Sequence, residues 1–212
     1  MHPEAFGGAG SLAALMPAAS GDFATRATRA EPGCLWFFWN RSVDDPNEYV
    51  LVEAFEDDGA EPRAVSAQRI VPGNVSFMAD QDGTLSQVVD GNPSTVWTSY
   101  GFSSAQFGSL ISGFGIAVQL QDPAKVSQVT VDQQGGTGGS FTVYTSDSPS
   151  LDGATEAGKG TFDAAQTTVR LNEQASSKTA RYVIVFVDSA PRLSQPIGGY
   201  PYGLRLGEIS VR

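Results

Sequence analysis

The residues best suited to do chemistry lie in one short stretch, VVDGNPSTVW at positions 88–97. It places the carboxylate of Asp90, the carboxamide of Asn92 and the hydroxyls of Ser94 and Thr95 within six positions. The Asp-Gly-Asn-Pro sequence predicts a tight turn, because glycine permits a positive φ and proline fixes its own φ. Oxygen atoms gathered on such a turn are suitable ligands for a hard cation such as Ca²⁺.

The same turn also has a purely structural interpretation. Asp90 and Asn92 would then bond the backbone of the turn itself, as these residue types commonly do. Trp97, which follows the turn, is predicted to anchor it in the hydrophobic core. The residues alone leave both interpretations open.

The composition limits the classes of partner. The 212 residues include 13 basic and 23 acidic ones, which gives a formal net charge of −10. A surface of this sign repels phosphate backbones and anionic lipid, so we expect neither nucleic acid nor a membrane surface as a partner. Hydrophobic residues make up 41% of the chain, enough for a packed core, and 24 glycines with 12 prolines favour short strands and many turns.

The residue types needed for common catalytic mechanisms are scarce. His2 is the only histidine and Cys34 the only cysteine, so a Ser-His-Asp or Cys-His centre lacks an interior base and zinc lacks ligands. Acidic residues are plentiful, but no spacing singles out a glycosidase pair. We therefore expect a protein that is not an enzyme. A single cysteine also excludes an intrachain disulfide, which leaves the cellular compartment open.

No run of about 18 apolar residues is present, so no segment is predicted to span a membrane. Residues 12–19 are too few for a signal peptide and lack a basic region before them. If the domain is exported, we expect the exporting element to lie outside this sequence.

Three regions are expected along the chain. Residues 1–30 are rich in Gly, Ala, Ser and Thr, which predicts a linker or disordered arm. Residues 31–64 are predicted to be an N-terminal extension able to supply extra strands, one of them at 49–55. Its apolar run at 35–39 favours a buried core strand or partner contact over an exposed ligand or membrane-interface patch. Residues 65–212 are predicted to form a β-sandwich.

The region 65–212 predicts strands and no long helix. From position 110 onward, runs of about five to eight β-prone residues alternate with clusters of Gly, Pro, Asn and Asp. Residues 69–77 are predicted as a further strand, 80–83 as a loop and 135–139 as a flexible hairpin connection. Strands without crossover helices imply an all-β fold, an antiparallel two-layer β-sandwich of the jelly-roll type.

The motif Asp-Gly-Asn-x-x-Thr-x-Trp at 90–97 resembles that of galactose-binding-like β-sandwiches, the discoidin or coagulation-factor C-type (F5/8 type C) domains and related carbohydrate-binding modules. The resemblance covers residues 66–212, and its other specific part is the closing Glu-Ile-x-Val strand. More narrowly, the chain resembles the extracytoplasmic C-terminal domain of some actinobacterial membrane proteins, which a kinase-like or flippase-like portion precedes. The family's strands are expected at 115–120, 125–131, 139–147, 181–187 and 206–211.

The resemblance implies a structural Ca²⁺ site that joins the start of the sandwich to its end. Its ligands are expected to be the side chains of Asp90, Thr95 and Glu208, with the carbonyls of Asn92 and of Val88 or Val89. The alternative keeps the same turn, with Glu208 bonded to backbone amides or to an arginine.

The resemblance also implies ligand binding in loops at one end of the sandwich, where aromatic rings stack on sugar faces and polar side chains bond hydroxyls. Tyrosine suits this role because it has an apolar face and a polar tip. The alternative is that these aromatic rings pack the loops onto the sandwich. The candidate ligand-binding residues are Tyr100, Phe102, Phe107, Arg192, Tyr200 and Tyr202.

The function expected from these features is a non-catalytic binding module that recognises a carbohydrate, such as a cell-wall glycan. The alternative is a protein-interaction or spacer ectodomain with no glycan ligand. A glycan module should present a solvent-facing aromatic ring with polar partners, whereas a protein-binding ectodomain should present a large apolar patch. In both cases we expect an extracellular or cell-surface location, as part of a larger membrane-anchored protein.

Overall fold

A computed structural model describes residues 34–41, 49–55 and 62–212 of the chain. The linker predicted for 1–30 lies outside the described residues. The chain divides into two compact units, Met1–Gly59 and Ala60–Arg212. Within the described ranges, no helix combines the length and the apolar character needed to cross a membrane.

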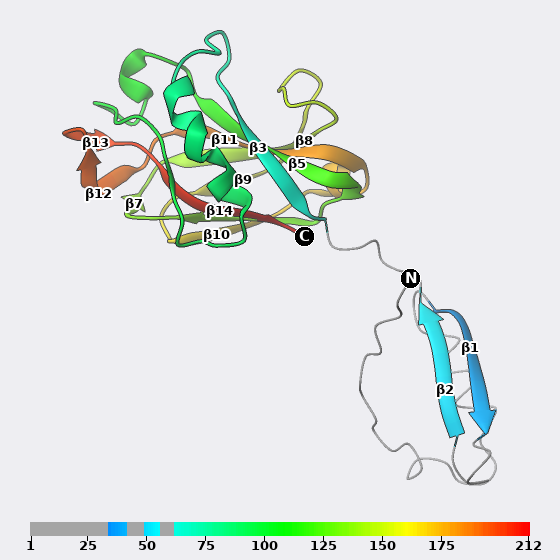
Figure 1. Ribbon diagram of the computed structural model, residues 1–212. Coiled ribbons are helices and arrows are strands. Elements are labelled where there is room, and N and C mark those ends of the chain that lie inside the picture. Colours follow the sequence, from blue (N-terminus) through cyan, green and yellow to red (C-terminus); the bar gives the residue numbers. More distant parts are fainter. Residues whose placement is uncertain (1–33, 42–48, 56–61) are drawn as a thin grey trace. The chain divides into compact units, whose positions relative to one another are not determined.

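The first unit contains a pair of antiparallel strands, β1 (Cys34–Arg41) and β2 (Tyr49–Phe55) (Figure 1). Their register sets Trp39 opposite Leu51 and Arg41 opposite Tyr49. The strand predicted at 49–55 is therefore confirmed. The apolar run at 35–39 lies in β1, but its predicted burial concerns side chains outside the described part of the structure.

The second unit is an antiparallel β-sandwich, which confirms the predicted fold class (Figure 1). A four-stranded sheet has the order β10-β6-β14-β4, a five-stranded sheet has the order β3-β5-β11-β8-β9, and a small sheet has the order β13-β12-β7. The strands are β3 (Ala64–Ile70), β4 (Trp97–Thr98), β5 (Phe114–Lys125), β6 (Gln128–Gln133), β7 (Gly136–Thr137), β8 (Ser140–Ser146), β9 (Thr155–Thr161), β10 (Gln166–Arg170), β11 (Thr179–Ser189), β12 (Arg192–Ile197), β13 (Tyr200–Tyr202) and β14 (Arg205–Val211). Three short helical segments accompany them: the 3-10 segments η2 (Ala79–Val89) and η3 (Phe107–Ser109), and α2 (Glu173–Ser176).

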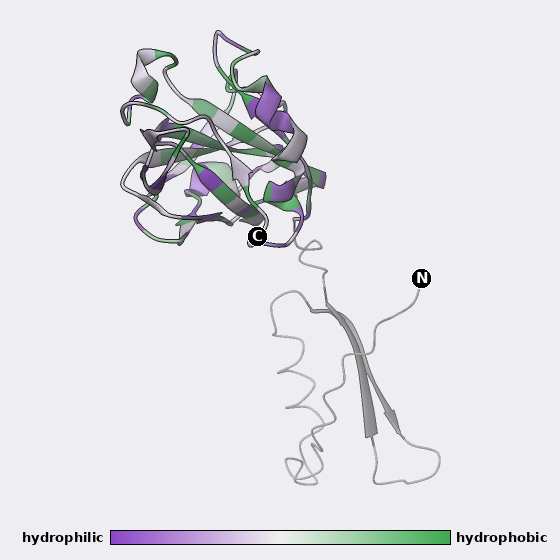
Figure 2. Cartoon of the chain, turned by 60° about the vertical axis from the view of Figure 1, so that its left-hand side comes forward, coloured by the Kyte–Doolittle hydropathy of each residue, from purple (hydrophilic) through white to green (hydrophobic). Residues whose placement is uncertain are grey.

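The core lies between the two large sheets. Buried and less buried residues alternate along β6, whereas parts of β5, β8, β11 and β14 are buried at consecutive positions. Hydrophobic residues are accordingly frequent along the strands of this unit (Figure 2). The inward positions are largely β-branched or aromatic, the residue types that favour strands. Examples of fully buried side chains are Ile116 and Val118 of β5, Val183 of β11 and Val129 of β6.

Some predicted elements differ from the structure. The strand predicted at 69–77 is wrong, because β3 ends at Ile70 and turns follow. Pro72 has no N–H for a sheet and Gly73 has a φ of +73°, which opens the turn. The loop predicted at 80–83 is instead part of η2.

Two connections carry more structure than the sequence indicated. The connection at 135–139 contains the short strand β7, which pairs with β12. The segment that follows β11 forms a hairpin of β12 and β13. Both segments are rich in glycine, which hides their pairing from any alternating pattern.

Candidate functional site

The turn that follows η2 is closed by its own side chains. The backbone amide of Asn92 donates to Asp90 Oδ1 at 2.8 Å, and the amide of Ser94 donates to Asn92 Oδ1 at 3.1 Å. The Thr95 hydroxyl donates to Asp90 Oδ2 at 2.9 Å and to the carbonyl oxygen of Asn92 at 2.7 Å. Gly91 has a φ of +78°, a conformation that favours glycine. The predicted Asx-turn is confirmed, and it gathers four oxygen-bearing groups on one side of the chain.

Glu208 of β14 lies against this turn. Its Oε2 accepts a hydrogen bond from the amide of Gly91 at 3.0 Å, and the residue is only 7% exposed. The pKa of Glu208 is raised to about 7, chiefly by burial. The amides of Gly91 and Asn92 oppose this shift, whereas the carboxylates of Asp90 and Asp132 add to it. Glu208 is therefore a carboxyl group that binds its proton unusually strongly beside other carboxylates.

A bulge in β14 brings Glu208 to the turn. The pairing of β14 with β6 shifts register between Leu206 and Glu208. Between them lies Gly207, where an added Cβ would be 2.6 Å from the carbonyl oxygen of Pro93. Glycine at this position therefore lets the backbone of the turn approach the closing strand.

The oxygens gathered here fit Ca²⁺ in their chemistry. The carboxylates of Asp90 and Glu208, the hydroxyl of Thr95 and the carbonyl of Asn92 are the hard ligands that this ion prefers. A hollow of about 290 Å³ borders both carboxylates and Val89. Among the described residues, no three His, Cys, Asp or Glu side chains gather into a metal-binding group. Any cation here would therefore need neutral oxygens to complete its coordination.

Trp97 fixes the far side of the turn. Its ring is fully buried and lies 5.9 Å, centroid to centroid, from that of Phe114. Its indole N–H donates to the carbonyl oxygen of Gln81 in η2 at 2.9 Å. The predicted role of Trp97 as a core anchor is confirmed.

The small sheet of β7, β12 and β13 presents part of the predicted ligand-binding set. Arg192 of β12 lies opposite Tyr202 of β13 and Thr137 of β7. Tyr200 is two residues from Tyr202 on the same strand, so both side chains lie on one face. Tyr200 is 51% exposed, and Arg192 is also exposed. Thr137, Arg192, Tyr200 and Tyr202 are called the hairpin surface below.

The backbone holds the hairpin surface in place. The β12–β13 turn at 198–199 has two glycines with φ of +57° and +86°, which the tight turns of hairpins require. Phe102 donates from its amide to Tyr202 at 2.7 Å and accepts from it at 3.2 Å. A Cβ added at Gly101 would lie 2.8 Å from the Cβ of Tyr200. The hairpin is thus pressed against the loop that follows Trp97.

Tyr100 lies in that loop with its polar tip already bonded. Its hydroxyl donates to the carboxylate of Asp80, which lowers the pKa of Asp80 and raises the pKa of Tyr100. Its ring meets the edge of Phe77 with the centroids 5.5 Å apart. The hydroxyl of Tyr100 is therefore already used as a donor, and the residue is partly exposed.

Phe102 and Phe107 are buried, and the ligand-binding role expected for them is corrected. They are 2% and 1% exposed, and their ring centroids lie 5.2 Å apart in an edge-to-face arrangement. Phe107 also contacts Phe114 of the core, at 5.8 Å. Their loop closes one end of the sandwich, so the rings gain more from burial than from exposure to solvent.

The sequence did not indicate the ion pair between Arg69 and Asp82. Two guanidinium nitrogens of Arg69 donate to the carboxylate of Asp82 at 2.8 and 3.0 Å, and only 4% of the Arg69 side chain is exposed. The pair joins β3 to η2. Thr137 was also missed, because nothing in the glycine-rich stretch around it predicts that it lies opposite Arg192.

A family model described as antibiotic biosynthesis monooxygenase (ABM) matches residues 21–67, less than half of the chain. No curated protein has a significant sequence match. Chitosan-binding module 1 of a chitosanase/glucanase from Paenibacillus sp. IK-5 is 21% identical with a TM-score of 0.49, over 73% of this chain and 99% of that one. The CBM32 of AlyQ in complex with 4,5-unsaturated mannuronic acid is 18% identical with a TM-score of 0.47, over 73% and 98%. CpGH89CBM32-6 from Clostridium perfringens is 13% identical with a TM-score of 0.44, over 69% and 93%.

The second unit is an antiparallel β-sandwich in which the turn at 90–97 is joined to the closing strand β14.

Proposed function

We propose that the second unit is a non-catalytic carbohydrate-binding module that binds its glycan at the hairpin surface. One observation carries this proposal: Tyr200 is half exposed beside Tyr202 and the exposed Arg192, on strands held by backbone contacts. A tyrosine ring can stack on the apolar face of a sugar, and a guanidinium can donate to its hydroxyls. The resemblance of the sequence to carbohydrate-binding modules supports the same chemistry.

We also propose that the module acts outside the membrane, extracellular or at the cell surface, as part of a larger membrane-anchored protein. A cell-wall polysaccharide is then the preferred glycan. The narrower resemblance to actinobacterial extracytoplasmic domains supports this placement, and the net charge of −10 argues against anionic polymers of the phosphate type.

We further propose a structural Ca²⁺ at the turn, held by Asp90, Thr95 and Glu208 with carbonyls of Asn92 and Val89. The support is the donor set and the raised pKa of Glu208, whose buried carboxylate a cation would stabilise. The ion would hold the turn against β14 and so stabilise the join between the two ends of the sandwich.

The proposed function is tested by screening the purified chain against a glycan panel that includes muropeptides and intact cell walls. A saccharide bound by the native chain, and lost with Tyr200→Ala or Tyr202→Ala, supports the module and its site. If no saccharide on the panel binds, the proposed function is contradicted and the protein-interaction or spacer function is favoured.

A further inference from the structure

The outer face of the four-stranded sheet carries polar side chains in matched rows. On β6, Gln128, Thr130 and Asp132 face away from the core, because the valines between them are buried. Thr130 lies opposite Thr168 of β10 on one side and Ser210 of β14 on the other. The hydroxyls of Thr130 and Thr168 are hydrogen bonded at 3.0 Å. Three neighbouring strands thus present a continuous row of hydroxyl groups.

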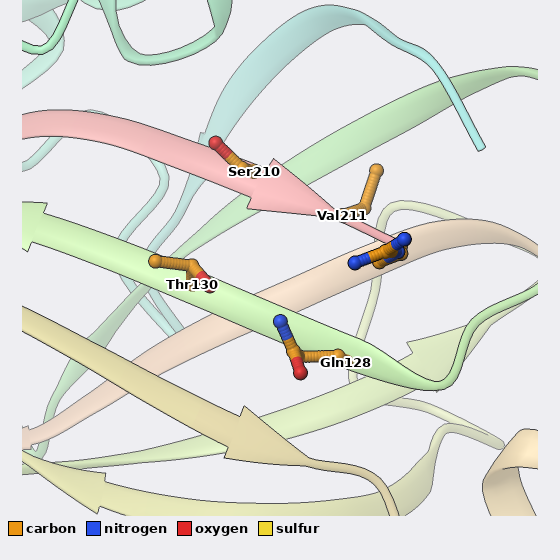
Figure 3. A pocket seen from close by; sticks show the side chains of 5 residues that line it. Gln128, Thr130, Ser210 and Val211 are labelled. Carbon is orange, nitrogen blue, oxygen red and sulfur yellow. The ribbon is translucent and has the colours of Figure 1, made fainter. Parts of the chain in front are cut away.

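A hollow of about 300 Å³ opens on this face, lined by Gln128, Thr130, Ser210, Val211 and Arg212. Figure 3 shows Gln128 and Thr130 on one strand and Ser210 and Val211 on its neighbour. Arg212 and Gln128 exchange backbone hydrogen bonds of 2.9 and 3.0 Å, which fixes the edge of the hollow. The lining supplies an amide, two hydroxyls and a guanidinium but no aromatic ring, so it suits a ligand that forms hydrogen bonds. It is called the sheet-face hollow below.

Exposed basic side chains gather at this end of the sandwich, although the chain as a whole carries a charge of −10. The register brings the end of β10 to the start of β6, and the end of β5 to the start of β11. Asp122 and Glu173 are the exposed acidic residues on these same segments. The exposed basic residues there are Lys125, Arg170, Lys178, Arg181 and Arg212.

We propose that the sheet-face hollow is a second saccharide site, selective for an acidic oligosaccharide of the uronate class. A ligand carboxylate meets the guanidinium group of the exposed Arg170, which lies opposite Gln128 and suits paired N–H···O bonds. Ligand hydroxyls meet Gln128, Thr130 and Ser210. This site is distinct from the hairpin surface, so the result of its test does not depend on the proposed function.

The arrangement of charge gives the ligand an orientation. Asp132 and Glu208 lie opposite each other on the same face, farther from the Arg170 end of the rows. The acidic group therefore lies toward Arg170 and neutral hydroxyls extend toward the carboxylates. Polyphosphate has no hydroxyl groups to meet Gln128, Thr130 and Ser210, so an acidic glycan is favoured over a phosphate polymer.

The test is a titration of trigalacturonic acid into the ¹⁵N-labelled full chain in calcium-free buffer, followed by amide shifts. Neutral cellotriose and polyphosphate are titrated in parallel. Arg170→Gln removes one charge beside the site, because Arg170 lies opposite Gln128. Lys159→Gln on β9 is the matched control, because it removes the same charge from the other sheet.

We expect shifts at the amides of Gln128, Thr130 and Ser210, and an affinity for trigalacturonic acid about tenfold lower in Arg170→Gln but unchanged in Lys159→Gln. Cellotriose should bind more weakly than trigalacturonic acid. The proposal is overturned if trigalacturonic acid shifts only the amides of the hairpin surface, if Arg170→Gln behaves like Lys159→Gln, or if polyphosphate binds as well as trigalacturonic acid. The thermal midpoint of each variant confirms that it is folded.

Discussion

The backbone amide of Gly91 donates to the carboxylate of Glu208 at 3.0 Å, across 117 positions of sequence. This bond joins the turn at the beginning of the sandwich to the strand that closes it. Glu208 is buried beside Asp90, and burial raises the pKa of its carboxyl group. The protonation state of Glu208 therefore affects both the charge at the turn and the stability of the contact between the turn and β14.

Stability in the absence of divalent cations should depend on pH through Glu208. Its pKa is raised from 4.5 to about 7, so between these values the folded state keeps a proton that the unfolded state has released. The free energy of unfolding should therefore be greatest below about pH 4.5 and fall as the pH rises to about 7. Urea denaturation across this window measures it. Glu208→Gln should remove most of the slope and Glu156→Gln should not; an unchanged slope in Glu208→Gln would refute this origin.

Calcium should raise the thermal midpoint. An ion that binds only the folded chain adds about 2.7 kcal/mol at a hundredfold excess over its dissociation constant, or roughly 5–10 °C for a domain of this size. Differential scanning calorimetry with Ca²⁺ and with chelator measures the shift. Asp90→Asn should abolish most of it, whereas Asp152→Asn on an exposed turn should retain it. Equal thermal midpoints of the native chain with Ca²⁺ and with chelator would contradict the proposed calcium site.

Gly207→Ala should destabilise the sandwich. The added methyl group would lie 2.6 Å from the carbonyl oxygen of Pro93, so the turn must move away from β14, at a cost of about 1–3 kcal/mol. Gly83→Ala in η2 is the control, because nothing lies within 4 Å of its added Cβ and its φ is not positive. Chemical denaturation compares the two. Similar stabilities for both variants would show that the turn does not press on Gly207.

The two kinds of aromatic residue near the hairpin should respond differently to truncation. Phe102→Ala empties a fully enclosed ring site and should reduce stability by about 3–5 kcal/mol. Tyr200→Ala removes a half-exposed ring and should change stability by about 0.5 kcal/mol or less. Urea midpoints distinguish the two residues. A large loss in Tyr200→Ala would mean that this ring supports the fold and is not free to meet a ligand.

The sequence predicted the long strands well, for a physical reason. Runs such as 181–187 combine β-branched and aromatic residues between turn signals, so local preference and burial agree. The positions of Phe102 and Phe107 could not be predicted, because a glycine- and serine-rich loop shows no periodicity that separates inward from outward residues. Whether such a ring is buried depends on distant segments that cover it.

The candidate site was predictable only in part. Asp90, Asn92 and Thr95 lie close together in sequence, and the turn chemistry alone brings their oxygens together. The approach of Glu208 depends on a strand pairing that no local pattern reveals, and only the family resemblance indicated it. The partnership of Arg192 with Thr137 and Tyr202 similarly arises from a three-stranded pairing within glycine-rich segments.

The most direct test of the account is a calorimetric titration of the best glycan from the panel into the native chain, Tyr200→Ala and Tyr200→Phe. We predict saturable binding to the native chain, a loss of about tenfold or more in Tyr200→Ala, and a loss of only a few-fold in Tyr200→Phe, which keeps the stacking face. Binding that is unchanged in Tyr200→Ala would contradict the hairpin surface as the site, and the absence of any glycan ligand would contradict the proposed function itself.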